Sequence, residues 1–188
     1  MTAIELVVAS VVLLVALLAL ASSMNASRTL RTVTTENGLA TDAAGNMLER
    51  LRNTTFDEVF ARYNDDPADD PNGPGTAPGH RFAVQGLRAL DSAADGLVGE
   101  VVFPTILAPS GALGPAGGPA PMVSQLREDV VDPALGMPRD LNADLVIDAA
   151  DHAGDYFVLP VSIELRWRGG NGERVHRVYT MLCELPRQ

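Results

Sequence analysis

Apolar residues fill the first part of the chain almost without a break. From Ala3 to Ala21, a run of 19 residues, only Glu5 and Ser10 are not apolar. A helix of about 20 apolar residues crosses the ~30 Å hydrocarbon core of a bilayer. A secretory signal has a basic start and a small-residue cleavage site, whereas this run begins at once and carries a carboxylate in its first turn. The pattern therefore predicts a transmembrane helix over residues 1–24.

A second helical pattern follows, and it has two faces. Residues of one face recur at spacings of three and four, with charged and polar residues between them: Leu30, Val33, Asn37, Ala40, Ala44, Met47 with Leu48, and Leu51. This spacing predicts an amphipathic helix that continues the first one, giving a single helix over residues 2–53 that is ~75 Å long. Thr55 and Glu58 have the spacing of a capping box, which predicts a separate short helix. Phe56, Phe60 and Tyr63 line the apolar side of this short helix, and we expect them to pack in the core.

The apolar period changes to two in the second half of the chain. Residues 81–85 and 98–107 are expected to form strands, the latter at an edge or bulge because Pro104 cannot donate to a ladder. Residues 161–168 alternate between apolar and polar, as in a half-buried strand. A glycine-rich turn then leads into residues 173–184, so a β-hairpin is predicted there.

These elements divide the chain into three parts. Residues 1–24 form the transmembrane helix, residues 25–63 the amphipathic extension with the short helix, and residues 64–188 a β-rich head. Within the head, residues 64–79 and 108–123 are rich in proline and glycine and are expected to be surface loops. The predicted fold is α+β, with a long N-terminal helix packed on an antiparallel sheet.

Composition narrows the possible functions. The 188 residues carry a net charge of −10, so we do not expect nucleic acid as a partner. Four of the arginines, Arg166, Arg168, Arg174 and Arg177, bracket the hairpin turn and are expected to be solvated and paired with Glu164 and Glu173. The single cysteine, Cys183, excludes an internal disulfide and is expected to be a small buried side chain on its strand. None of the three histidines has a nucleophile at a recognisable spacing, so no enzyme is predicted.

The first eight residues resemble the processed N-terminus of type IV pilins and type II secretion pseudopilins. Met1 is apolar, Glu5 is the fifth residue, and an unbroken apolar helix follows, as in that family. The start Met1-Thr2 is most similar to minor pilins and minor pseudopilins. The resemblance implies a pilin-like roll and a prepilin peptidase that cleaves a short leader and methylates the new amine. It also implies assembly machinery and other pilin-like subunits as partners.

The pilin resemblance also implies how the chain is used. The subunit is held in the bacterial inner membrane and then polymerises into an extracellular filament at the cell surface. Met1 and Glu5 are the expected assembly residues, because a carboxylate among apolar helices needs a positive partner and the α-amino group of Met1 is the nearest one. Three alternatives remain open: a minor pseudopilin, a single-span anchor for a calcium-dependent adhesive domain, and a membrane-tethered enzyme.

A second motif lies in residues 140–151. Oxygen-bearing side chains occupy positions 1, 3, 5, 9 and 12 of this segment, and the carbonyl of position 7 is available, a spacing that suits calcium. The expected ligands are Asp140, Asn142, Asp144, Val146, Asp148 and Asp151. The segment resembles the EF-hand loop, and more closely the dockerin variety.

One position departs from the EF-hand pattern. Position 6, normally glycine, is Leu145, which would need a positive φ angle or a rearranged loop. Five aspartates and no basic residue lie in residues 140–155, so a cation would relieve their repulsion. Asp155 and the acidic 64–79 loop are considered as additional ligands. The alternative is an acidic turn that ends one element and caps the next.

Overall fold

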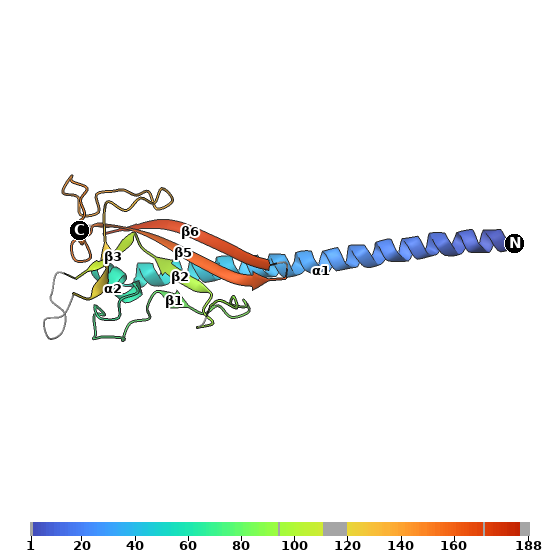
Figure 1. The fold of residues 1–188 in the computed structure, drawn as a ribbon, viewed down its shortest axis with the longest axis horizontal. Coiled ribbons are helices and arrows are strands. Elements are labelled where there is room, and N and C mark those ends of the chain that lie inside the picture. The colour runs from blue at the N-terminus through green and yellow to red at the C-terminus, as the bar shows by residue number, and fades with distance from the viewer. Residues whose placement is uncertain (1, 94, 111–119, 171, 185–188) are drawn as a thin grey trace.

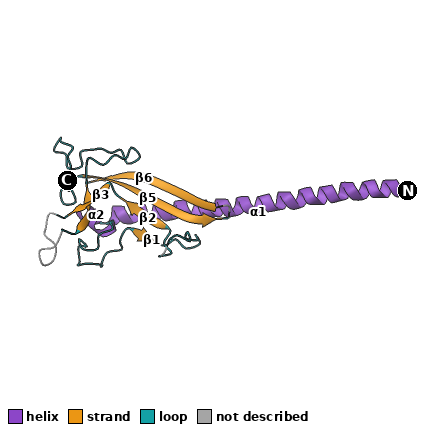
Figure 2. Ribbon diagram, viewed as in Figure 1, coloured by secondary structure: helices purple, strands orange, loops and turns teal. Residues whose placement is uncertain are grey.

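The computed structural model describes residues 2–93, 95–110, 120–170 and 172–184, and it has an α+β fold (Figures 1 and 2). One long helix projects from a head made of strands and loops. The helical elements are α1 (Ala3–Asn53), the 3₁₀ turn η1 (Phe56–Glu58) and α2 (Val59–Tyr63). The strands are β1 (Arg81–Phe82), β2 (Gly99–Val102), β3 (Thr105–Pro109), β4 (Met122–Leu126), β5 (Val158–Gly169) and β6 (Gly172–Cys183).

Helix α1 has the length that the sequence predicts. It runs unbroken for 51 residues, from the apolar run into the amphipathic segment. It ends where Thr54 turns to an extended conformation, with φ −83° and ψ 147°. The short helix predicted after it is also present as η1 and α2, although the Thr55 side chain makes no capping hydrogen bond.

The head contains two antiparallel sheets. Four strands pair in the order β1-β2-β5-β6, and β3 pairs with β4 separately. The predicted hairpin is the longest pairing, with a register from Val158 opposite Cys183 to Gly169 opposite Gly172. Its turn end lies beside the middle of α1 and points along the helix towards the N-terminus (Figure 1).

Two predicted strands differ from those observed. The strand expected over residues 81–85 is only the two-residue β1. The strand expected over residues 98–107 is two strands, β2 and β3, which belong to different sheets. The break comes at Phe103 and Pro104, because proline has no amide to extend the β2 ladder beyond Val102. Strand β4 also begins inside the segment expected to be a loop, at Met122.

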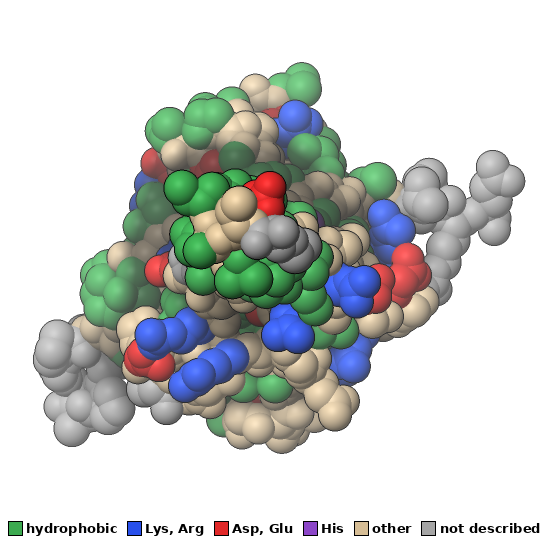
Figure 3. All heavy atoms as spheres, turned by 90° about the vertical axis from the view of Figure 1, so that its right-hand side faces the viewer, with side chains coloured by type: hydrophobic (Ala, Val, Ile, Leu, Met, Phe, Trp, Pro, Cys, Tyr) green, Lys and Arg blue, Asp and Glu red, His purple; other side chains and the backbone are tan. Residues whose placement is uncertain are grey.

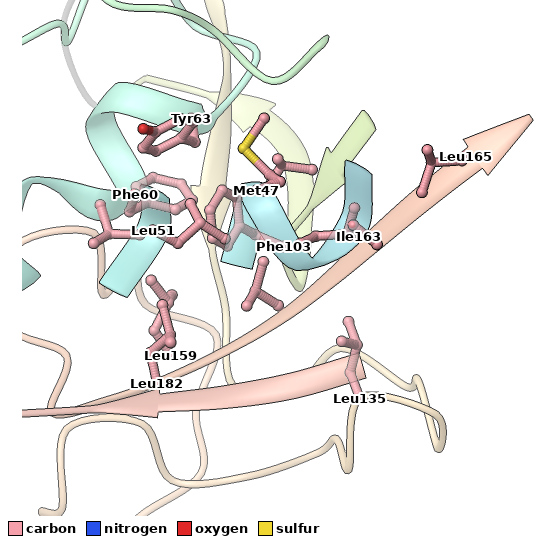
Figure 4. Close-up of a cluster of buried hydrophobic side chains, with 14 of the residues drawn as sticks. Met47, Leu51, Phe60, Tyr63, Phe103, Leu135, Leu159, Ile163, Leu165 and Leu182 are labelled. Carbon is pink, nitrogen blue, oxygen red and sulfur yellow. The ribbon is translucent and has the colours of Figure 1, made fainter. Parts of the chain in front are cut away.

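The core lies where α1 crosses the β5–β6 hairpin. One face of the helix is buried there through Ala40, Ala44, Met47 and Leu51. The facing side chains of β5 are Leu159, Val161, Ile163, Leu165 and Trp167, each no more than 1% exposed. Phe60 and Tyr63 of α2 close the cluster at one end, as expected for that aromatic face (Figure 4). The small alanines let the helix axis approach the sheet closely.

The amphipathic face of α1 is buried in its second half only. Leu30, at the upstream end of the same face, is 66% exposed. The hairpin turn contacts α1 at Glu36, whose Oε2 atom accepts a hydrogen bond from Trp167 Nε1 at 3.3 Å and lies 3.7 Å from Arg174 Nε. Gly169 leaves room for this contact, since a Cβ atom there would lie 2.5 Å from Arg174 Nε and 2.9 Å from the same carboxylate oxygen, and both side chains would have to shift.

Cys183 is exposed, contrary to expectation. Alternate residues of β6 face opposite sides of the sheet, and its neighbour Leu182 is the one that packs towards the core. The sulfur is therefore on the solvent side, at the end of β6 far from the hairpin turn.

We expect Leu51→Ala to lower the free energy of unfolding by about 2–5 kcal/mol, because it leaves a cavity where α1 meets the sheet. Leu51 is 1% exposed. Denaturant unfolding of the full chain in detergent micelles measures the change. Leu30→Ala on the same helix is the matched control and should change the stability little. Equal effects of the two substitutions would contradict the assignment of the core.

Candidate functional site

The first candidate site is the part of α1 that extends beyond the head. Each of residues 2–28 is exposed, and the helix is long and apolar enough to cross a membrane. Fourteen large apolar side chains between Ile4 and Leu30 are 53–75% exposed: Ile4, Leu6, Val7, Val8, Val11, Val12, Leu13, Leu14, Val15, Leu17, Leu18, Leu20, Met24 and Leu30. They cover all sides of the helix rather than one stripe. A helix that is apolar all round is stable only inside a membrane or surrounded by other protein.

Glu5 lies in the first turn of this helix. Its Oε2 atom accepts a hydrogen bond from the backbone amide of Thr2 at 2.8 Å. The carboxylate therefore caps an amide that the helix leaves unpaired, and it lies at the positive end of the helix dipole. Met1, the other expected assembly residue, is outside the described residues.

The second candidate site is the 140–151 loop. The Asp140 carboxylate organises its first half: Oδ1 accepts the amide of Ala143 at 2.6 Å and Oδ2 that of Leu145 at 2.8 Å. Leu145 has a φ of 71°, the positive value expected for position 6 of an EF-hand-like loop without glycine. The loop thus adopts the sharp turn that the motif needs, at the cost of an unfavourable conformation for leucine.

The structure brings together only part of the expected ligand set. Asn142 Nδ2 lies 3.4 Å from Asp144 Oδ2, and Asp144 Oδ1 accepts the Val146 amide at 2.8 Å. Asp148 is turned towards His152, with 3.3 Å between Oδ1 and Nε2. Asp151 is turned the other way, and its Oδ1 atom accepts the Leu126 amide at 3.1 Å. A single pocket of six converging oxygens is therefore not formed by the described side chains.

A buried carboxylate that the sequence did not suggest holds the loop in place. Glu128 follows β4 and is completely buried. Its Oε1 atom accepts the amides of Leu141 at 2.6 Å and Asn142 at 3.3 Å, and its Oε2 atom accepts the amide of Asp148 at 3.3 Å. Glu128 therefore fixes both ends of the segment Leu141 to Asp148. The sequence did not predict this role of Glu128, because the loop that it binds begins 12 residues later and no motif links the two.

His152 completes a group of ionisable side chains around Glu128. Its Nε2 atom is 3.8 Å from Glu128 Oε2, and its Nδ1 atom is 3.1 Å from Asp155 Oδ1. Ligand atoms of Glu128, Asp148 and His152 lie within 4.8 Å of one another, so this group could hold a metal ion. Asp155, which the sequence suggested as an additional ligand, contacts both His152 and Asn142.

The carboxylates around His152 favour its charged form. Burial alone would lower the pKa of the imidazole, but hydrogen bonds to Asp148 and Asp155 and the charge of Glu128 outweigh burial. The pKa of His152 is therefore raised above its ordinary value of 6.5. The amide of Ala150 and the His152 ring lower the pKa of Asp148 below 3.8. The cluster therefore stabilises the imidazolium relative to the neutral ring.

The four arginines at the hairpin turn face carboxylates, two of them the expected Glu164 and two of them other residues. Arg166 and Arg177 both pair with Glu164. Arg168 pairs with Asp91 rather than with Glu173, and Arg174 faces Glu36 on α1. Asp91 and Glu36 come from distant parts of the sequence, so their role could not be read from the hairpin alone.

Comparisons with known protein families, with curated proteins and with solved structures found no match for this chain. The architecture itself, a long apolar N-terminal helix on an antiparallel sheet, is consistent with a pilin-like protein.

We expect the calcium-free chain to lose stability as the pH rises. A group whose pKa is raised on folding stabilises the fold fully below its unfolded value, near 6.5, and this contribution is lost as the pH passes its higher folded value. Denaturant unfolding in excess chelator between about pH 6 and pH 9 should show the fall. His152→Gln should remove it, and His80→Gln should not. An equal slope in His152→Gln would contradict the role of this ring.

Proposed function

We propose that this chain is a structural subunit of a type IV pilus-like filament that polymerises through its apolar N-terminal helix. One observation carries the proposal: the same helix is apolar and uncovered over residues 2–28 and forms the core of the head from Ala40 onwards. The apolar half is therefore joined to the head without a flexible linker. This rigid connection suits a subunit whose helix packs inside a filament and whose head covers the outside.

The cost of exposing α1 to water explains why its extraction from the membrane would be coupled to polymerisation. Exposing the large apolar side chains of α1 to water would cost on the order of 20 kcal/mol. Lipid removes this cost while the subunit is stored in the membrane. When the helix leaves the membrane, neighbouring helices of the same kind can replace the lipid. Self-association through α1 is thus the arrangement that keeps this surface out of water.

Glu5 has a specific role in this proposal. A carboxylate surrounded by packed apolar helices is costly unless a positive group lies near it. In this structure the carboxylate lies against the Thr2 amide, next in sequence to Met1. We assign the partner to the α-amino group of Met1, from the same or a neighbouring subunit. Methylation of that amine, as the pilin resemblance implies, keeps its charge.

The proposal places the chain in the bacterial inner membrane before assembly and in a surface filament afterwards. The expected partners are other copies of this chain, other pilin-like subunits, the prepilin peptidase and the assembly machinery. The role is structural and not catalytic. A minor pseudopilin would use the same helix in a short complex, and electron micrographs of purified material distinguish the two. Long filaments support the pilus, and small stoichiometric complexes support the pseudopilin.

We further propose that calcium stabilises the head through the 140–151 loop. Carboxylate, amide and carbonyl oxygens are the ligands that calcium prefers, whereas a nitrogen ligand such as His152 suits transition metals. Asp140, Asn142, Asp144, the Val146 carbonyl, Asp148 and Asp151 are the proposed ligands. The positive φ of Leu145 supports the assignment.

Calcium binding in this loop would require two side chains to move. Asp148 would turn away from His152, and Asp151 would leave the Leu126 amide. Calcium and the His152 imidazolium would then be alternative cations for the same acidic cluster. This competition accounts for a loop that is ordered by Glu128 but has its carboxylates only partly converged.

We expect Glu5→Val to leave membrane insertion intact and to reduce filament formation strongly. Valine removes the carboxylate that the terminal amine needs, while the apolar helix remains able to cross a bilayer. Membrane fractionation and filament yield by electron microscopy measure the two effects. Glu49→Val, at an exposed position of the same helix, is the control. Normal filament yield from Glu5→Val would contradict the assembly role of Glu5.

We expect a chelator to lower the melting temperature of the chain by several degrees, because an ion that binds only the folded state stabilises it. Asp144→Ala should have the same effect in calcium and should make the melting curve insensitive to chelator. Asp42→Ala, at an exposed position on α1, is the matched control. An unchanged melting curve in excess chelator, with no metal retained by the protein, would remove calcium from the proposal.

A further inference from the structure

Arginine side chains gather at the end of the head from which the apolar helix emerges. Three segments meet there: residues 25–36 of α1, residues 86–93, and the hairpin turn at 166–174. The Arg88 carbonyl accepts the Arg168 amide at 2.8 Å, which joins the second segment to the third. Seen along α1 from its N-terminal side, arginines lie around the helix on one side of the head (Figure 3).

This surface, which we call the proximal basic surface, is opposite in charge to the rest of the chain. It contains six arginines, Arg28, Arg31, Arg88, Arg166, Arg168 and Arg174, and four carboxylates, Glu36, Asp91, Glu173 and the Arg166 partner Glu164. Its net charge is +2 in a chain whose total is −10. The two aspartate-rich segments, 64–79 and 140–155, contain nine aspartates and no arginine, and they lie towards the other end of the head (Figure 1).

Several of these positive charges are available to a partner. Arg28, Arg31 and Arg88 are exposed, and none of them has an ion pair within the part of the chain that the structure describes. Arg166 and Arg168 are paired, but their side chains remain 51% and 50% exposed. Exposed pairs of this kind are weak, so a phosphate can compete for these guanidinium groups.

The helix determines what this surface faces. If Ala21 marks the edge of the hydrocarbon, Arg28 lies about 10 Å above it and Arg31 about 15 Å above it, both beyond a headgroup layer about 5–8 Å thick, towards which their long side chains can extend. The hairpin turn is level with Glu36 and lies about 22 Å above the edge of the hydrocarbon when the helix is upright. A tilt of the helix lowers the turn, and the length of an arginine side chain then allows its guanidinium group to reach the headgroups. Residues 22–27, which carry no charge, fill the interval.

We propose that the proximal basic surface binds the anionic headgroups of the membrane in which α1 is held, and thereby tilts the head towards the lipid. Charge complementarity carries the assignment, since phosphate groups are the nearest anions to this surface when α1 spans the bilayer. The aspartate-rich segments are repelled by the same headgroups and point away. The inference rests on membrane insertion of α1 and not on filament formation.

The native Cys183 offers a direct measurement of this tilt. It is exposed and lines the same cavity as Leu51, so it lies about 45 Å above the hydrocarbon edge when the helix is upright. A tilt of about 30° lowers it by about 6 Å. Energy transfer from a fluorophore on Cys183 to acceptor lipids in reconstituted vesicles therefore reports the height of the head.

The full chain is compared in vesicles of phosphatidylcholine alone and with about 30% phosphatidylglycerol, at about 50 mM and about 0.5 M NaCl. We expect stronger transfer in the anionic vesicles at low salt, and loss of this difference at high salt. The combined variant Arg28→Gln, Arg31→Gln and Arg88→Gln should also lose it. The combined variant Arg50→Gln, Arg52→Gln and Arg139→Gln has the same change in charge at exposed positions away from this surface and should retain it.

The outcomes separate the lipid contact from membrane insertion. A chain that floats with both kinds of vesicle but shows equal transfer in them overturns the lipid contact alone. A chain that does not float overturns membrane insertion and the lipid contact together. Transfer that changes with the ratio of protein to lipid, equally in neutral vesicles, assigns the surface to a second copy of this chain and overturns the lipid contact.

Discussion

The exclusion of one apolar helix from water is the constraint on which the rest of this structure depends. Helix α1 is unbroken for 51 residues, so its apolar first half and its amphipathic second half move as one body. The second half is buried against β5 through small and medium side chains, whereas residues 2–28 are exposed in the part of the chain that the structure describes. Whatever surrounds the first half therefore determines where the head is placed.

The hairpin turn sets the boundary between these two environments. Glu36 binds Trp167 and faces Arg174, and the absence of a side chain at Gly169 lets the turn approach the helix. Below this contact the amphipathic face of α1 is uncovered, as Leu30 illustrates. The same turn carries the arginines that give this end of the head its positive charge. The contact that ends the buried part of α1 is therefore also the place where the arginines of the turn lie close to the helix.

The acidic loop shows a different way of stabilising like charges. Glu128 is fully buried, yet three backbone amides of the loop satisfy its oxygens. His152 lies among the carboxylates of Glu128, Asp148 and Asp155, which favour its protonated form. Hydrogen bonds to Glu128 and Asp140 therefore shape the loop, and the proposed calcium ion would bind next to these contacts.

Much of this arrangement could be predicted from the sequence, because the signals are local. The apolar run and the spacing of three and four residues predicted α1, and the alternation of residues 161–168 with a glycine-rich turn predicted the β5–β6 hairpin. The place of Leu145 at the glycine position of a known loop left two outcomes, a positive φ or a rearranged loop, and the structure has the positive φ. In each case the relevant residues are neighbours in the chain, so periodicity and spacing carry the information.

Contacts between distant segments decided the rest. The separation of β2 from β3 at Pro104, the exposure of Cys183 and the role of Glu128 depend on which strand or loop lies opposite, and one sequence does not state that. Asp148 was expected to face calcium but faces His152, because Glu128 holds both ends of that segment. The sequence by itself determined the helix, the hairpin and the acidic loop, and the tertiary structure decided which charges meet, because pairing and burial depend on distance in space rather than along the chain.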